Sequence, residues 1–365
     1  MQTIDLRRRV PLFSCLLVVA GICLFSSSAR GQGCVNARQC TQVMDPNSIN
    51  ITGASGSSSF GESWLSPRRW QLSVDYRYLH SHRHFVGTTE QTQRATERTE
   101  VNNIIHLVNV SATYEFSPRI SLSTTVPLFF ADRYNQRTPD QVSSATGVGD
   151  ISLVGRVWLL RPPAESRQNI SLGFGVKFPT GNPGVVDTVN TPTGPVTRVV
   201  DQSIQPGDGG YGYIVDFQGY KAIKKATVYA SGVYLVNPRN TNGVLTGRSR
   251  ASEAVMSVAD QYSYRAGAIL PFPKFHSLVW SMGIRGEGVP SRDVLGKSDG
   301  FRRPGYSLDV EPGLICMKGK NTWSFSVPVP FLRARTRSVS DILENRHGDA
   351  AFADYVLLVG YSRRF

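Results

Sequence analysis

The sequence predicts an all-β protein, a transmembrane antiparallel up-and-down β-barrel of about 12 strands, with a range of roughly 10–14. Apolar and polar residues alternate in one segment after another, as they do in strands whose two faces meet different surroundings. The connections between these segments alternate between long and short, and the last segment ends on an aromatic residue, Phe365. A soluble sheet has no reason to alternate its loop lengths so regularly. These three observations therefore favour a barrel of the bacterial outer membrane.

The first 32 residues have the three parts of a secretory signal peptide. Arg7, Arg8 and Arg9 form the positive region, residues 10–25 are apolar, and small residues follow at 26–29, with cleavage expected between Ala29 and Gly33. An apolar segment of this length is short for a membrane-spanning helix. After the first 30 residues no run of about 18 apolar residues occurs, which excludes a helical membrane protein.

Residues 33–68 are polar, rich in Ser, Gly and Asn, and show neither helical nor strand periodicity. They are predicted to be a flexible periplasmic lead-in to the barrel. Cys34 and Cys40 lie six positions apart in this segment, and an exported protein can join such a pair in a disulfide. A metal-binding pair is the alternative, although the sequence offers no nearby ligands to complete such a site.

Residues 69–365 are predicted to form the barrel, because the alternation begins and ends with them. In the first strand Trp70, Leu72 and Val74 share one face, and Gln71 and Ser73 share the other. The same pattern defines the later strands. In chain order, the strands are expected at residues 69–79, 103–116, 120–128, 148–160, 169–179, 210–218, 223–236, 261–270, 275–287, 306–316, 322–331 and 353–365.

Connection lengths predict which end of each strand faces outward. Long connections such as residues 180–209 are expected outside, and short turns such as residues 219–221 in the periplasm. Both ends of the chain then lie on the periplasmic side. Pro328 and Pro330 each give up a ladder hydrogen bond, so they predict a bulge or an early end to their strand.

The final strand places Tyr355, Leu357 and Val359 on the lipid face. Tyr361 and Phe365 continue that face, and a terminal Phe after such a strand resembles the assembly signal of outer-membrane barrel proteins. The barrel-assembly machinery is therefore an expected partner. Arg363 interrupts the apolar face near the periplasmic rim, and its side chain is expected to reach the lipid headgroups.

Two motifs carry a more specific family resemblance. Gly147-Val148-Gly149-Asp150 resembles the G-x-G-D start of a strand in the outer-membrane proteins named for the MetA pathway of phenol degradation. Residues 172–181, L-G-F-G-V-K-F-P-T-G, resemble the next strand of that family and its Pro-Thr-Gly exit into a long loop. The resemblance implies an outer-membrane β-barrel associated with the uptake of aromatic or hydrophobic compounds. Arg363 departs from the terminal signature, which usually carries an apolar residue there.

The net charge of +13 is compatible with any anionic partner, and the distribution of the basic residues indicates which kind is expected. The basic residues are scattered singly through loops and are not clustered on a helix, so nucleic acid is not predicted. Outer-membrane lipids and lipopolysaccharide are the expected anionic partners.

The inner faces of the predicted strands are rich in Ser, Thr and Gly and carry charges of both signs. Such charges line a water-filled channel and select solutes, or they pair across the lumen and close it. The lumen-lining candidates are Asp75, Arg77, Glu115, Asp150, Arg156, Lys177, Asp216, Arg265, Arg285, Asp309, Glu311 and Asp354.

His80, His82 and His84 share one face if the first strand continues, and imidazoles suit Zn or Cu. No further ligand is indicated, so neither a metal site nor another cofactor is predicted. Ser81 lies beside two of these histidines, but neighbours on a strand point to opposite faces and cannot form a nucleophile–base pair. The chain is therefore not predicted to be an enzyme.

Three functions follow, in order of preference. The first is passive transport of small solutes, aromatic or hydrophobic ones among them, across the bacterial outer membrane. The second is a structural or surface-interaction barrel that transports nothing, and the third is an outer-membrane lipid hydrolase. A measurement of solute flux separates the first two functions. The third requires that lipid hydrolysis is lost when His80, His82 or His84 is substituted.

Overall fold

A computed structural model describes residues 69–161, 166–275 and 277–365. The predicted signal peptide, the predicted lead-in and the Cys34–Cys40 pair lie outside the described residues. Within the described ranges, no helix is both long enough and apolar enough to cross a membrane.

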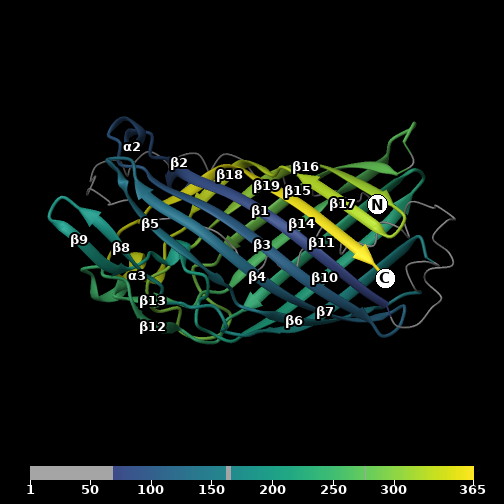
Figure 1. Cartoon of the computed structure of the whole chain (residues 1–365), viewed down its shortest axis with the longest axis horizontal. Helices are drawn as coiled ribbons and strands as arrows, with labels where there is room; N and C mark the ends of the chain where they lie inside the picture. The colour runs from purple at the N-terminus through teal and green to yellow at the C-terminus, as the bar shows by residue number, and fades with distance from the viewer. Residues whose placement is uncertain (1–68, 162–165, 276) are drawn as a thin grey trace, which may run out of the picture. The chain divides into compact units, whose positions relative to one another are not determined.

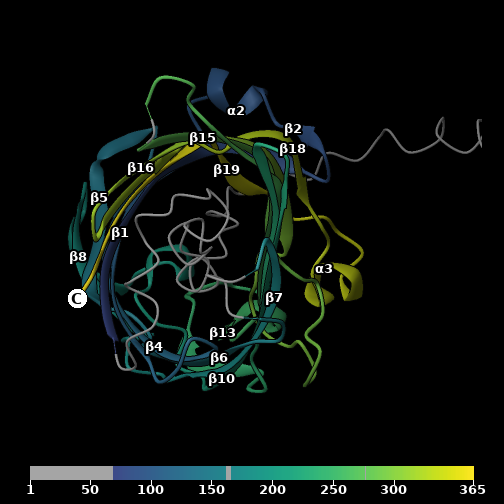
Figure 2. The ribbon, with the colours of Figure 1, turned by 90° about the vertical axis from the view of Figure 1, so that its right-hand side faces the viewer.

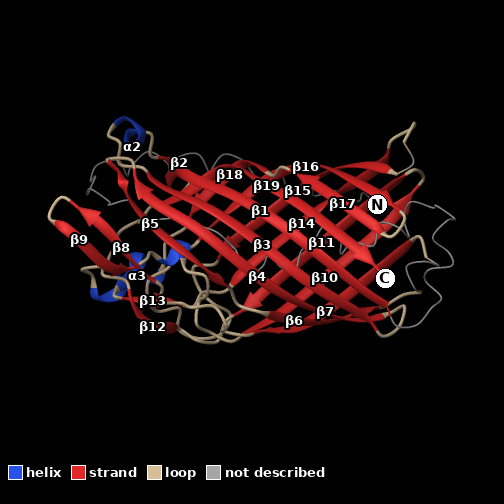
Figure 3. Ribbon diagram, viewed as in Figure 1, coloured by secondary structure: helices blue, strands red, loops and turns tan. Residues whose placement is uncertain are grey.

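The described chain forms a closed antiparallel β-barrel, which confirms the predicted fold class (Figures 1 and 3). The first wall strand pairs with the last, so the sheet has no free edge. The wall consists of β1 (Arg69–Val86), β3 (Val101–Glu115), β4 (Ile120–Asn135), β5 (Thr138–Val148), β6 (Ser152–Trp158), β7 (Gln168–Lys177), β10 (Gly212–Ile223), β11 (Ala226–Val236), β14 (Gln261–Pro271), β15 (Leu278–Val289), β16 (Gly305–Lys318), β17 (Asn321–Ser326), β18 (Val329–Arg335) and β19 (Ala350–Arg364).

The wall has twelve strands, because two of them are interrupted. β5 and β6 pair with successive parts of β4, and β17 and β18 pair with successive parts of β16. The second interruption falls at Val327 and Pro328, where the prolines of this strand predict it. The Pro328 carbonyl accepts a hydrogen bond from the backbone of Val356 in β19, at 2.9 Å, so the wall stays closed across the break.

Smaller elements belong to the long connections, which gather at one end of the barrel in Figure 1. We call this the long-loop end, and the opposite end, where the chain finishes, the short-turn end. The elements are β2 (Thr89–Glu90), α2 (Gln93–Thr96), β8 (Val186–Thr191), β9 (Gly194–Val199), η4 (Gln202–Ile204), β12 (Thr241–Leu245), η5 (Ala251–Glu253), β13 (Val255–Ser257) and α3 (Val339–Leu343).

Several wall strands are longer than the alternation predicts. β1 continues to Val86, and β4 and β5 form a hairpin through residues predicted to be a loop. The reason is that polar residues such as Asp132, Asp140 and Ser143 interrupt these extensions, so they carry no regular apolar alternation although their backbones pair. Ser144, for example, pairs with Asp132 across the hairpin, and its hydroxyl donates a hydrogen bond to that carboxylate at 2.6 Å.

The two faces of the wall differ sharply in chemistry. On β1, Trp70 is 52% exposed on the outer face, whereas Ser73 and Arg77 are buried on the inner face. Contiguous apolar surface of this kind is stable in lipid, not in water. Other exposed apolar side chains are Leu72, Val74, Val110, Leu153, Leu172, Phe174, Val215, Phe217, Ile284, Val310, Phe325 and Val359.

Candidate functional site

One long connection, residues 178–211 between β7 and β10, packs its residues 200–206 against the inner face of the wall, while its β8–β9 hairpin forms a separate, largely exposed sheet. Its residues Val200 and Ile204 are fully buried in an apolar cluster with Leu107 of β3 and Phe129 of β4. Burying an aliphatic side chain of this size stabilises the fold by about 1.5–3 kcal/mol. We call residues 178–211 the infolded segment. Figure 2 shows the closed ring of wall strands viewed along the barrel.

Asp150 joins the infolded segment to the wall. It is fully buried at the gap between β5 and β6, and its carboxylate accepts backbone hydrogen bonds from Gly181 at 3.0 Å and Asp208 at 3.1 Å. The Thr180 hydroxyl donates to the carbonyl of Gly149 at 2.8 Å and accepts from Ile151 at 2.9 Å. The G-x-G-D and Pro-Thr-Gly motifs, which the sequence shows as two separate signatures, therefore form one junction.

Close packing, against backbone in one case and a proline ring in the other, explains two glycines of this junction. A Cβ on Gly181 would lie 2.8 Å from the Cα of Gly207, and one on Gly149 would lie 2.8 Å from the Cγ of Pro127. Lys177, at the end of β7, forms ion pairs with Asp150 and Asp208. Both ends of the infolded segment are thus held at the same point of the wall.

A second anchor holds the middle of the infolded segment. The Asp201 side chain caps η4 by accepting from the Ser203 backbone, and it receives two hydrogen bonds from Arg303, at 2.8 and 2.7 Å. Arg133 of β4 lies 3.6 Å away. Burial would raise the pKa of the Asp201 carboxyl, but Arg133 and Arg303 hold that pKa well below its usual range.

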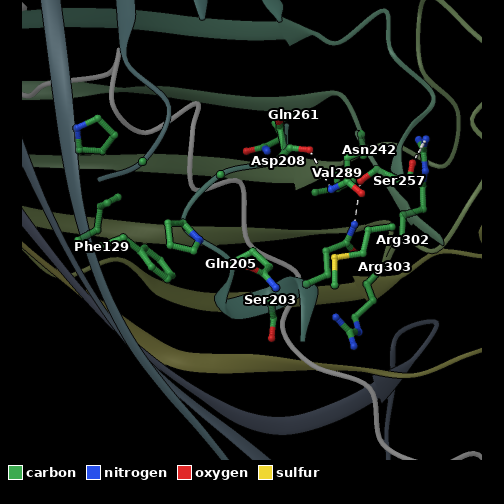
Figure 4. A pocket seen from close by; sticks show the side chains of 18 residues that line it. Phe129, Ser203, Gln205, Asp208, Asn242, Ser257, Gln261, Val289, Arg302 and Arg303 are labelled. Atoms are coloured by element: carbon green, nitrogen blue, oxygen red, sulfur yellow. Dashed lines mark hydrogen bonds between the residues drawn. The ribbon is translucent and has the colours of Figure 1, made fainter. Parts of the chain in front are cut away.

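A cavity lies between the infolded segment, the wall and the connections that follow β11 and β15 (Figure 4). Its water-accessible volume is about 90 Å³. One water needs roughly 10–15 Å³, so the cavity has room for several. One part of its lining is apolar, with Leu107, Phe129 and Met256. The other part is polar, with Arg302, Arg303, Asp208, Gln202, Gln205, Asn242 and Gln261.

Most of the predicted lumen charges form ion pairs along the wall. Arg156 of β6 bonds to Asp216 of β10 through two nitrogens, at 3.2 and 2.9 Å. The two side chains meet over β7, where Gly173 is the register partner of both. A Cβ at that position would lie 2.5 Å from the Asp216 carboxyl. Because Gly173 has no side chain, it leaves the space that this ion pair occupies.

A larger cluster crosses the lumen. Arg77 of β1 reaches Glu287 of β15, 2.5 Å away, although three wall strands separate β1 from β15. Glu287 also pairs with Arg285 at 3.2 Å. Arg285 and Arg265 lie 3.9 and 3.8 Å from Glu311 of β16, and Asp309 stands opposite Arg285 in register. These charges are balanced within the barrel.

The remaining lumen candidates lie apart from these clusters. Glu115 is 3.9 Å from Arg364 near the short-turn end, and Asp75 stands between Asn109 and Gly360 in register. Asp354 has a half-exposed side chain, and Arg83 approaches it to 2.7 Å.

The three histidines do not share a face, contrary to the expectation from their spacing. At the register shift between Ser81 and Arg83, β1 has one residue more than β19, and this changes the direction of the side chains along β1. His80 and His82 stack with ring centroids 4.8 Å apart, whereas His84 is fully buried. In the described ranges, no group of three or more His, Cys, Asp or Glu residues could hold a metal ion.

His84 instead fastens the long-loop end of the barrel. Its Nε2 accepts a hydrogen bond from the backbone of Val101, so the proton lies on Nδ1, which donates to Asp349 at 3.0 Å. Arg94 of α2 pairs with the same carboxylate at 2.8 Å. This network links the ends of β1, β3 and β19.

The terminal residues lie at the seam between β19 and its neighbours. Tyr361 donates its hydroxyl to Asn321 at 2.9 Å, and the Phe365 backbone donates to Trp70 at 2.9 Å. Arg363 is exposed, and its guanidinium lies 5.3 Å from the centre of the Phe365 ring.

Sequence reasoning missed the charged residues of the connections that line or support the cavity. Asp201, Asp208, Arg302 and Arg303 lie outside the regular strands, where alternation assigns no face. The one local signal is Asp201 at the start of a short helical turn, since Asp is a preferred capping residue.

Comparison with known proteins supports the fold. No family model matches the chain, and no curated protein sequence matches it. An outer-membrane channel from Pseudomonas putida F1 is similar in structure, with a TM-score of 0.58 and 11% identity over 82% of this chain and 97% of that one. The chain thus has the fold of an outer-membrane β-barrel.

Two further solved structures are more distant. They are the β domain of the Bordetella autotransporter BrkA (TM-score 0.43, 10% identity, 82% of this chain and 100% of that one) and the P. putida toluene transporter TodX (TM-score 0.41, 8% identity, 87% and 94%).

Proposed function

We propose that this protein is a passive channel of the outer membrane for small solutes with an apolar or aromatic body. The observation that carries the proposal is the cavity inside a closed barrel, between apolar side chains such as Phe129 and polar ones such as Gln205. Pockets that bind small molecules combine these two kinds of lining. The similar P. putida structure is described as an outer-membrane channel. The resemblance to the phenol-degradation family supports an aromatic solute.

The proposal includes an orientation of the barrel in the membrane. The long-loop end faces outside, so a solute reaches the infolded segment before it reaches the ion pairs of the wall. The apolar outer face contacts outer-membrane lipid and lipopolysaccharide, and β19 with Tyr361 and Phe365 is the segment that the barrel-assembly machinery recognises. The solute moves down its own gradient, and the mechanism includes no chemical step.

Conductance of the refolded full chain in planar bilayers tests the proposal. We expect single-channel steps in KCl from the wild-type protein, and larger steps from Asp150→Ala, because that substitution releases the infolded segment. The matched control is Asp140→Ala, which changes an exposed carboxylate of β5 outside the infolded segment. If neither the wild type nor Asp150→Ala conducts, the barrel is not a channel and the structural alternative stands.

A further inference from the structure

The turns at the short-turn end of the barrel carry positive charge. Among the residues that the structure describes, each of the five turns there has at least one lysine or arginine, and none has an aspartate or glutamate. The long connections, in contrast, carry both signs and contain ion pairs such as Arg303 with Asp201. The exposed basic residues of the short turns are Arg119, Arg161, Arg167, Lys224, Lys225, Lys274 and Lys320.

Three basic residues gather where β16, β17 and β19 lie side by side at this end (Figure 1). Lys318 pairs in register with Asn321 of β17, which pairs in turn with Arg363 of β19. Neighbouring strands are about 4.8 Å apart, so the Cα atoms of Lys318 and Arg363 are about 10 Å apart. Lys320 lies in the turn between β16 and β17, and its carbonyl accepts a hydrogen bond from the backbone of Arg364 at 3.0 Å. The three residues therefore form one group, held by the pairing of three strands.

Two members of this group stand on the lipid face of the wall. Along β16, Val310 and Leu314 are exposed at alternate positions, and Lys318 continues the same face. Along β19, Val359 marks that face, and Arg363 continues it. Both side chains are long, so from the edge of an apolar face their charged ends can reach lipid headgroups.

Aromatic side chains mark the level of the membrane interface beside the group. Trp323 of β17 and Tyr361 of β19 are register partners, and their ring centres are 5.6 Å apart. They precede Arg363 and follow Asn321 by two residues, which places them about 7 Å further along the wall. Because Trp and Tyr are enriched at the headgroup level, the basic residues lie where the phosphates of the lipids are expected.

The charges of this group are available to a partner outside the chain. In the described ranges, Lys318, Lys320 and Arg363 take part in no ion pair with a carboxylate, whereas the neighbouring Arg364 lies 3.9 Å from Glu115. All three side chains are exposed. Basic residues that stand together at a membrane surface attract anionic lipid.

We propose that Lys318, Lys320 and Arg363 form a binding site for the headgroup of an anionic phospholipid. The phosphodiester lies between Lys318 and Arg363, in front of Asn321, and an acyl chain follows the wall past Trp323. Phosphatidylglycerol suits the site better than phosphatidylcholine, because its headgroup carries no ammonium group that the cations would repel. The inference goes beyond the proposed channel function, since the site lies on the outside of the wall.

Native mass spectrometry of the refolded full chain, released from detergent micelles, tests the inference, because it resolves each lipid that is bound to the barrel. The probes are phosphatidylglycerol and phosphatidylcholine with identical acyl chains, titrated separately. We expect the first phosphatidylglycerol to bind at least about tenfold more tightly than the first phosphatidylcholine, because more than one basic residue contributes to its binding.

Variants assign this preference to the named side chains. Lys318→Gln and Arg363→Gln each remove one charge, so each should weaken phosphatidylglycerol about fivefold and leave phosphatidylcholine unchanged. The matched control is Lys221→Gln, because Lys221 is also exposed on the outer face at the short-turn end, on β10, which is not adjacent to β16, β17 or β19. It should leave both affinities unchanged. An unchanged thermal unfolding transition shows that each variant is folded.

The results separate the inference from the proposed function. Equal affinities for the two lipids would overturn the inference. An equal loss in Lys221→Gln and Lys318→Gln would also overturn it, because that result would show a diffuse effect of charge and not a site. A preference for phosphatidylglycerol that only the two site variants reduce would uphold the lipid site, even in a barrel that conducts no ions in bilayers.

Discussion

The arginines of the wall and the arginines of the cavity both pair with carboxylates, but their pairs join different parts of the chain. In the wall, Arg156 and Arg285 each direct Nε to a carboxylate, at 3.2 Å in both cases. At the cavity, Arg302 and Arg303 direct only their terminal nitrogens to carboxylates. Arg77 of the wall likewise directs only its terminal nitrogens to Glu287, so end-on pairing occurs in both regions. What differs is what the pairs join, because Arg156 and Asp216 belong to wall strands, whereas Arg303 and Asp201 belong to two connections. The wall pairs therefore hold strands together, and the Arg303 pair holds the infolded segment in place.

The largest effect is expected when an ion pair of the wall is broken. Asp216→Ala leaves Arg156 without its carboxylate in the barrel, and removing one partner of a buried pair costs about 3–5 kcal/mol. The double variant Arg156→Met, Asp216→Leu should regain most of that stability, because no charge is left unpaired. Urea unfolding of the barrel in lipid vesicles measures both. A loss below 1 kcal/mol in the single variant would show that the pair does not hold the wall.

An intermediate effect is expected where the infolded segment meets the wall. In Gly181→Ala the added Cβ meets backbone atoms of Gly207 and Gly149 at 2.8 and 3.0 Å, so the segment must shift at a cost of about 1–3 kcal/mol. Faster proteolysis within residues 178–211 measures the shift. The control is Gly155→Ala in β6, whose added Cβ has its nearest neighbour at 3.8 Å. Equal cleavage rates in the two variants would contradict the close packing.

The smallest effect concerns a connection that does not touch the cavity. Ser338 caps α3 by accepting from the backbone of Asp341 at 3.0 Å, and the Asp341 side chain accepts from the backbone of Ser338 in return. Ser338→Ala should lower the local stability of α3 by about 1 kcal/mol. Hydrogen exchange of residues 338–343 measures this loss, while Ser338→Thr, which keeps the capping oxygen, should exchange like the wild type. Affinity for phosphatidylglycerol should stay the same in both.

The wall could be predicted from the sequence, because burial on one face and lipid on the other leave a period of two in the residues. That period places Arg156 and Asp216 on the inner face. It does not pair them, since their contact depends on the register of β6, β7 and β10 and on the missing side chain of Gly173. It also does not show the true ends of β4 and β5, because polar residues interrupt the alternation in their hairpin.

The cavity could not be predicted, because its polar residues come from connections whose paths depend on packing between distant parts of the chain. Asp201 and Arg303 are 102 residues apart and meet only when the infolded segment lies inside the wall. The two family motifs could be recognised singly, yet their meeting at Asp150 is a tertiary contact. His84 shows the same limit inside a strand, because a register shift after Ser81 changes the face that its spacing predicts.

The pairing of β1 with β19 also determines how the barrel can form. The side chains of Gln71 and Arg364 are 3.1 Å apart across this seam but are separated by 293 residues of chain. Contacts between such distant residues are slow to form, because the entropy of closing the loop is lost before the contacts compensate for it. Closure of the ring is therefore expected to be the late and slow step of folding, after the neighbouring hairpins have formed. Until then both edge strands stay open, which is the stage at which a nascent barrel most needs help against aggregation.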